Sequence, residues 1–173
     1  MRRSGSASAR AALLALALLL PLGGCRYGYG FAGGGLPTNV RTAAVLPFDN
    51  NTAVPELQRE IADALRTGLQ RRLGLRSAPE ARANAIVRGT IVNYDADVPV
   101  AYNADPTQST TARRKLVLTV DVEIAEQQSG TVLFARKGMR AEGEYAEGAE
   151  ALGRQQAIDR IVSQVIEGAQ SQW

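Results

Sequence analysis

The chain has 173 residues with 20 basic and 17 acidic side chains, a formal net charge of +3, one cysteine and no histidine. The lack of histidine excludes Ser-His-Asp and Cys-His catalytic arrangements and histidine metal sites. A single cysteine also excludes a disulfide within the chain. We expect no cofactor and no metal.

The N-terminus has the pattern of a secretion signal. Residues 11–20 are a short run of Ala and Leu, too short to span a bilayer as a stable helix, and they follow a basic segment that contains Arg2, Arg3 and Arg10. Leu22-Gly23-Gly24-Cys25 then resembles the bacterial lipobox, in which a small residue before the cysteine permits cleavage and the thiol accepts diacylglycerol. Residues 1–24 are therefore expected to be a lipoprotein signal peptide, with Cys25 as the lipid attachment residue. An ordinary signal peptide with an incidental cysteine is the alternative.

Cleavage after Gly24 would leave 149 residues, the size of one domain with a substantial core. Three arginines would leave with the signal, so 17 basic and 17 acidic residues would remain. The positive charge of the whole chain is therefore no argument for nucleic-acid binding. No second hydrophobic stretch is long enough to cross a membrane, and we expect a protein that is anchored by lipid without spanning the membrane.

Residues 25–37 are rich in glycine and aromatic side chains and predict a lipidated tether. They contain a G-x-G-x-x-G spacing made by Gly28, Gly30 and Gly33. A dinucleotide site needs a strand before this motif and a helix after it, whereas here no strand precedes it and Pro37 follows. We therefore reject a dinucleotide site here. Residues 38–173 are expected to form a single α/β domain.

The first half of this domain predicts a strand, a turn and a helix. Residues 40–48 form the strand, and Asp49-Asn50-Asn51-Thr52 form the turn. The helix begins near Pro55, which suits the first helical position, and ends at Gly74. Apolar residues recur along it every three or four positions, which indicates one buried stripe: Val54, Leu57, Ile61, Leu65, Leu69 and Leu73.

The second half predicts three strands and a final helix. Residues 83–94 form a strand, and 95–112 a long polar loop of the kind that is functional or mobile. Residues 113–125 alternate between apolar and polar side chains, which is typical of a strand with one covered face. Gln127-Gln128-Ser129-Gly130 predicts a hairpin turn before a strand over residues 131–139. The last helix starts at about Glu147, with this apolar stripe: Leu152, Ile158, Ile161, Val162, Val165, Ile166 and Ala169.

A turn centred on Gln128-Ser129 predicts the register of the hairpin. Lys115 then faces Glu142 and Asp121 faces Arg136 on the wet side, while Leu118 meets Met139 and Ile124 meets Leu133 on the other side. Lys137 is the misfit, because it would point with the core face opposite Val120. A local bulge or an exit of its amine past the sheet edge would be needed.

The element order is β-α-β-β-β-α, an α+β class. Two helices with one apolar stripe each need one apolar sheet face to cover. We therefore expect two helices packed on one face of a four-stranded mixed sheet.

Four features resemble the LPS-assembly lipoproteins, the LptE family. They are Cys25 followed by the aromatic and glycine segment 27–33; Leu36-Pro37 before the strand 40–48 and Asp49-Asn50-Asn51-Thr52; the helix from Pro55; and the segment 83–91. The later strand pair and helix match in order and spacing. The chain departs from the family at 75–82, where an extended stretch is usual and this sequence offers only Leu75-Arg76-Ser77-Ala78-Pro79, so an extra edge strand there stays open.

The resemblance implies a non-enzymatic lipoprotein on the periplasmic side of the outer membrane. It also implies a large β-barrel partner of the LptD type, whose lumen the protein plugs, and a role in delivering lipopolysaccharide to the outer leaflet. Arg26 follows the cysteine, where lipoproteins retained in the inner membrane commonly carry aspartate. Sorting to the outer membrane is thus favoured.

Two other classes of protein are alternatives. Residues 42–50 followed by a helix also resemble envelope lipoproteins of the curli-secretion (CsgG) and TolB N-terminal type, which act as secretion pores or docking domains; residues 33–37 fit the first family better. A periplasmic hydrolase has little support, since Asp95, Asp97 and Asp105 lie in the expected loop without a histidine or a nucleophile motif.

Basic residues on two adjacent strands are the candidate ligand site. Lipid A presents two phosphates, which Arg and Lys bind well beside an apolar surface. Lys115 and Arg136 already have carboxylate partners in the expected register. The hypothesis is therefore that Arg113 and Arg114 contact lipid A, with Lys137 and Arg140 as secondary contacts and Glu144 as the one expected partner of Arg113.

Overall fold

The computed structural model describes residues 36–99 and 113–171. The expected signal peptide, Cys25, most of the tether and loop residues 100–112 lie outside these residues. The described elements are β1 (Thr42–Val45), β2 (Asp49–Asn50), α2 (Glu56–Leu73), β3 (Arg76–Ser77), the 3-10 helix η2 (Glu80–Arg82), β4 (Ala85–Pro99), β5 (Arg113–Glu126), β6 (Val132–Ala146) and α3 (Glu150–Ser171).

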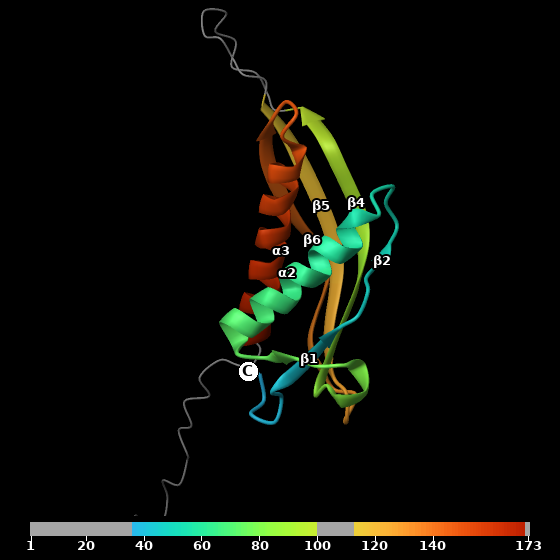
Figure 1. Ribbon diagram of the computed structural model, residues 1–173, viewed down its shortest axis with the longest axis vertical. Helices are drawn as coiled ribbons and strands as arrows, with labels where there is room; N and C mark the ends of the chain where they lie inside the picture. The colour runs from blue at the N-terminus through green and yellow to red at the C-terminus, as the bar shows by residue number, and fades with distance from the viewer. Residues whose placement is uncertain (1–35, 100–112, 172–173) are drawn as a thin grey trace, which may run out of the picture. The chain divides into compact units, whose positions relative to one another are not determined.

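The described part of the chain forms a six-stranded mixed sheet rather than the four-stranded sheet expected. The strand order is β3-β1-β4-β5-β6, and β2 also pairs with β4. β1, β2 and β3 make parallel pairs, while β4, β5 and β6 form an antiparallel meander. Figure 1 shows both helices on one face of this sheet, as expected.

β2 and β3, the two strands that the sequence did not predict, are short. β3 pairs with β1 through Thr42 and Arg76, so an edge strand does form in the segment that the family comparison left open. β2 pairs with Thr90 and Ile91 of β4, so the expected turn at 49–52 is wrong for its first two residues. Asn50 then turns the chain, because its side-chain oxygen accepts hydrogen bonds from the Thr52 amide and hydroxyl at 2.9 and 2.7 Å.

The helix α2 begins and ends as the sequence predicts. Pro55 precedes its first residue, and Gly74 ends it with a φ of 68°, the left-handed conformation that glycine adopts at little cost. The four central residues of its stripe, Leu57, Ile61, Leu65 and Leu69, are buried.

The antiparallel strands and α3 complete the core. The apolar residues of β5 are buried as predicted: Leu116, Leu118, Val120, Val122 and Ile124. The α3 stripe is buried from Ile158 to Ala169, but Leu152, expected in the stripe, has 61% of its surface exposed. The stripe therefore begins after the first turn of α3. None of the described helices is long and apolar enough to cross a membrane.

The strands β4 and β6 run further than their apolar patterns suggested. β4 continues to Pro99 and β6 to Ala146, where the sequence predicted ends at Tyr94 and Met139. Both extensions pair with the start of β5: Arg114 lies opposite Pro99 and opposite Tyr145. The first five residues of the expected loop are therefore strand, because backbone pairing with β5 does not require an apolar sequence.

The predicted hairpin register holds only beside the turn, where Ala125 lies opposite Val132. One shift follows between Ile124 and Ala125 and another between Val120 and Val122, so that Val120 meets Met139 and Lys115 meets Glu144. The expected opposition of Asp121 and Arg136 is wrong, since Arg136 lies opposite Val122. The bulge that Lys137 required is present.

Candidate functional site

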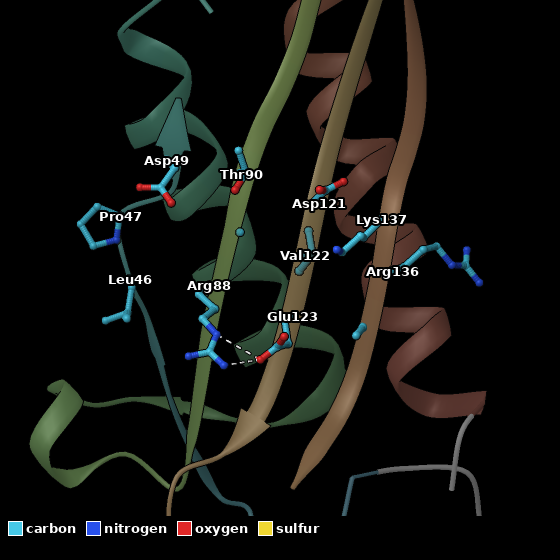
Figure 2. Close-up of a pocket in the computed structure, with 12 residues that line it drawn as sticks. Leu46, Pro47, Asp49, Arg88, Thr90, Asp121, Val122, Glu123, Arg136 and Lys137 are labelled. Carbon is cyan, nitrogen blue, oxygen red and sulfur yellow. Dashed lines mark hydrogen bonds and ion pairs between the residues drawn. The ribbon is translucent and has the colours of Figure 1, made fainter. Parts of the chain in front are cut away.

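The outer face of the sheet carries an open hollow of about 590 Å³ on the side away from the helices (Figure 2). It is lined by Leu46, Pro47, Asp49, Arg88, Gly89, Thr90, Asp121, Val122, Glu123, Ala135, Arg136 and Lys137. Its floor is the solvent-exposed face of β4 and β5, and one wall is the bulge in β6. Arg88 donates to one oxygen of Glu123 from Nε at 3.0 Å and from Nη2 at 2.5 Å, so this cation is already neutralised.

Lys137 is the candidate residue that the β6 bulge places beside this hollow. Gly138 has a φ of 63°, and its amide donates to the Asp121 carboxylate at 2.7 Å. Figure 2 shows the Lys137 amine directed toward β5 and the Arg136 side chain directed away from it. Neither cation makes an ion pair with another residue of the described ranges 36–99 and 113–171. Lys137 is thus the least neutralised of the four candidate cations.

Arg113 and Arg114 lie at the start of β5, beside the residues that the structure leaves undescribed. Arg113 pairs with Glu144 at 3.6 Å, as the sequence predicts. Arg114 pairs with Asp97 at 2.6 Å and with Glu147 at 3.6 Å, and the Asp97 charge raises the pKa of the Arg114 guanidinium. The sequence did not predict either partner of Arg114, because it placed Asp97 in a loop and ended β6 at Met139, whereas β6 continues to Ala146, directly before Glu147.

Arg140 belongs to a small charged cluster on the wet face. Lys115 donates to Glu142 at 2.8 Å, and Arg140 lies 3.5 Å from the other oxygen of that carboxylate. The predicted pair of Lys115 and Glu142 therefore forms, although Glu144 is the residue directly opposite Lys115. The hydrogen bond from Lys115 lowers the pKa of Glu142.

The structure does not bring the four candidate cations to one point. Arg113 and Arg114 lie at one end of the β5-β6 pair, Arg140 lies opposite Thr119, and Lys137 lies next to the bulge. At about 3.3 Å per residue, the strand positions of Arg113 and Lys137 are separated by more than about 20 Å. The candidates form a row along the strands that a single phosphate cannot bridge.

A second polar cluster links the sheet to both helices, and the sequence gave no signal for it. The Tyr94 hydroxyl of β4 donates to Glu150 of α3 at 2.5 Å, and Arg154 binds Glu60 of α2 at 2.8 and 3.1 Å. Burial raises the pKa of the Tyr94 hydroxyl. These residues lie far apart in the sequence and satisfy one another, so we assign them to the docking of the helices.

The same fold occurs in solved structures of bacterial proteins. The PelC dodecamer from Paraburkholderia phytofirmans matches with a TM-score of 0.53 and 16% identity over 80% of this chain and 93% of that chain. The protein XCC0632 from Xanthomonas campestris matches with a TM-score of 0.54 and 8% identity over 79% and 87%. At these identities the likeness concerns the fold alone.

Sequence comparison identifies the family. No curated protein matches the chain. The family model described as LptE, lipopolysaccharide-assembly, matches residues 40–168. This range runs from the residues before β1 almost to the end of α3, and it includes every described strand. The chain therefore belongs to the LptE family of lipopolysaccharide-assembly lipoproteins.

Proposed function

We propose that this protein assembles with an outer-membrane β-barrel of the LptD type and assists the transport of lipopolysaccharide and its insertion into the outer leaflet. The match of the LptE family model over residues 40–168 carries the proposal. The family consists of assembly lipoproteins rather than enzymes, so the proposed role is structural. The protein would lie on the periplasmic face of the outer membrane, held there by lipid on Cys25.

Purification from mildly solubilised membranes tests the partnership. The lipoprotein should elute with one outer-membrane barrel in fixed stoichiometry, and depletion of the lipoprotein should lower the amount of lipopolysaccharide at the cell surface. An eluate without a barrel would contradict the proposal.

Lipid A is the proposed ligand of the basic row, with Arg113 and Arg114 as the main contacts and Lys137 and Arg140 as secondary contacts. The ion pairs of Arg113 and Arg114 are exposed: 73% of the Arg113 side chain and 74% of the Asp97 side chain are accessible. Exposed ion pairs contribute only about 0–1 kcal/mol to the free energy of unfolding. A phosphate that binds either arginine can therefore displace its carboxylate partner.

A second candidate function is that of a secretion or docking component that assembles with copies of itself. The observation that favours it is the fold shared with PelC, which forms a dodecamer. Native mass spectrometry of the purified lipoprotein distinguishes the two candidates. A complex with one barrel supports the first, and a ring of identical chains supports the second.

A further inference from the structure

The strand β6 lies at the end of the described sheet, where its second side has no strand beside it. β5 is its one strand neighbour among the residues that the structure describes. A strand of 15 residues that has no strand along one side is a template for pairing with another chain. Such an edge requires protection if the protein is not to associate through it.

Three side chains of α3 bind backbone groups of β6 at this edge. The Glu144 amide donates to Gln156 Oε1 at 3.3 Å, Arg160 Nη1 donates to the Glu142 carbonyl at 2.9 Å, and Gln164 Nε2 donates to the Arg140 carbonyl at 3.1 Å.

The spacings of the two elements explain why these contacts form a ladder. Gln156, Arg160 and Gln164 recur every four residues and therefore lie on one face of the helix. Residues 140, 142 and 144 recur every two residues, so their backbone groups point to the same side of the strand. Each further turn of α3 thus places a side chain at the next outward-pointing backbone group of β6. Figure 1 shows α3 running beside β6.

We propose that Gln156, Arg160 and Gln164 form an edge guard that keeps β6 from pairing, edge to edge, with a second copy of this chain. The three side chains occupy backbone donors and acceptors that an added strand would need. The three side chains therefore prevent association through this edge, in addition to holding α3 on the sheet.

A second copy of the chain is the occupant that the charges of this edge favour. If two β6 strands pair antiparallel about Glu142, Arg140 of each copy faces Glu144 of the other, which is an attractive pair on both sides of the centre. The two Glu142 side chains would meet, but each already carries a Lys115 ammonium at 2.8 Å. Without the guard, this register is available.

The test is the triple variant Gln156→Ala/Arg160→Ala/Gln164→Ala in the full-length lipoprotein, purified in mild detergent and followed by analytical ultracentrifugation over a dilution series. Dimerisation should occur at a concentration at least about a hundredfold lower than in the wild type, because six backbone contacts per dimer no longer compete with strand pairing. Adding Glu144→Arg to the triple variant should reverse the dimerisation, since Arg140 would then face an arginine.

The matched control is Gln155→Ala/Asp159→Ala, which changes exposed residues of the same helix outside the ladder and should leave the association unchanged. A folded triple variant that associates like the wild type would overturn the proposal. So would a wild-type dimer that Glu144→Arg dissociates, because the edge would then already be in use. If the triple variant does not fold by circular dichroism, Arg160→Ala alone serves, with a smaller shift expected in the same direction and no shift counting against the guard.

Discussion

A single polar side chain binds the backbone at one of the two register shifts of the long hairpin. Asp121 has no residue directly opposite it in the β5-β6 ladder, and its carboxylate instead accepts the Gly138 amide. This bond stabilises the bulge that turns Lys137 toward the wet face. One carboxylate thus supports the backbone conformation that places a candidate ligand residue on this face.

Replacing Asp121 by alanine should lower the free energy of unfolding by about 1 kcal/mol, the net value of one hydrogen bond at a site that water can reach. Urea denaturation measures the change. Asp121→Asn is the matched control, because it keeps a side-chain oxygen as acceptor and should retain most of the stability. Equal losses in both variants would show that the bond to Gly138 is not the cause.

The pair of Lys115 and Glu142 should make stability depend on pH. The hydrogen bond from Lys115 lowers the pKa of Glu142 below its ordinary value of 4.5, so the stabilisation is present above about pH 4.5 and is lost as the pH falls through the folded-state pKa. Glu142→Gln should therefore melt at a lower temperature than the wild type at pH 7, and this difference should shrink at pH 3. A difference that stays constant between the two pH values would exclude the carboxylate as its origin.

At the scale of elements, close backbone contact holds α3 on the sheet. A Cβ atom at Gly143 of β6 would lie 1.8 Å from the Gly153 carbonyl oxygen of α3. Because that neighbour is backbone, a side chain at position 143 would force the helix away from the strand. The apolar stripe of α3 and the edge contacts of Gln156, Arg160 and Gln164 depend on this approach.

Gly143→Ala should therefore cost at least about 2 kcal/mol of unfolding free energy, in the range of overpacked cores. Gly74→Ala is a useful comparison, since a Cβ there has open space and meets only the strain of a φ of 68°, worth about 1 kcal/mol. Chemical denaturation of both variants shows which of them is less stable. A Gly143→Ala variant no less stable than Gly74→Ala would mean that α3 moves away from β6 easily.

At the scale of the whole molecule, the two faces of the sheet have different roles. One face is covered by α2 and α3 and forms the core (Figure 1). The other carries most of the charged residues of β5 and β6, including Arg113, Lys137 and Arg140 of the proposed lipid A contacts. Arg114 alternates with Arg113 along β5 and lies opposite the buried Tyr145, on the face of the helices. Binding can therefore be altered on the second face without disturbing the core.

Arg113→Gln/Arg114→Gln should weaken lipopolysaccharide binding by about tenfold. The loss should be greatest at low salt, because exposed charges are screened as ionic strength rises. Binding of fluorescent lipopolysaccharide measured over a salt series provides the readout, with melting temperature and barrel association close to wild type. Arg59→Gln/Arg71→Gln removes the same charge from the exposed side of α2 and should leave binding unchanged. If the first variant binds normally, these arginines serve the sheet edge and not the ligand.

Lipidation of Cys25 is the remaining prediction at this scale. Cys25→Ala should yield an uncleaved precursor or a form that is not held in the membrane. The intact mass of the wild type should include about two or three acyl chains, because a single chain anchors only marginally. Membrane fractionation and mass spectrometry provide the measurements, and an unmodified N-terminus at another residue would disprove the lipobox interpretation.

Local patterns were enough to predict the main elements and the layer arrangement. The limits of α2, the wet and dry faces of β5 and the turn after β5 follow from the spacing of apolar residues and from Pro55 and Gly74, all of which act within a few residues. The family resemblance likewise rested on short motifs, and the match over residues 40–168 confirms it. For the candidate site, the sequence predicted the pair of Arg113 and Glu144 and the pair of Lys115 and Glu142.

The sequence by itself determined the two helices and the apolar parts of the four longer strands, and which of their faces is apolar, because burial selects residue type at each position. Only the tertiary structure decided where β4 and β6 end, which residues face Arg114 and Asp121, and how the β6 edge is covered. Those outcomes depend on backbone hydrogen bonds between distant segments, which any residue except proline can donate. The register shifts of the hairpin then change which residue lies directly opposite each position beyond them, which is why the fold class was predictable while the partners of Arg114 and Asp121 were not.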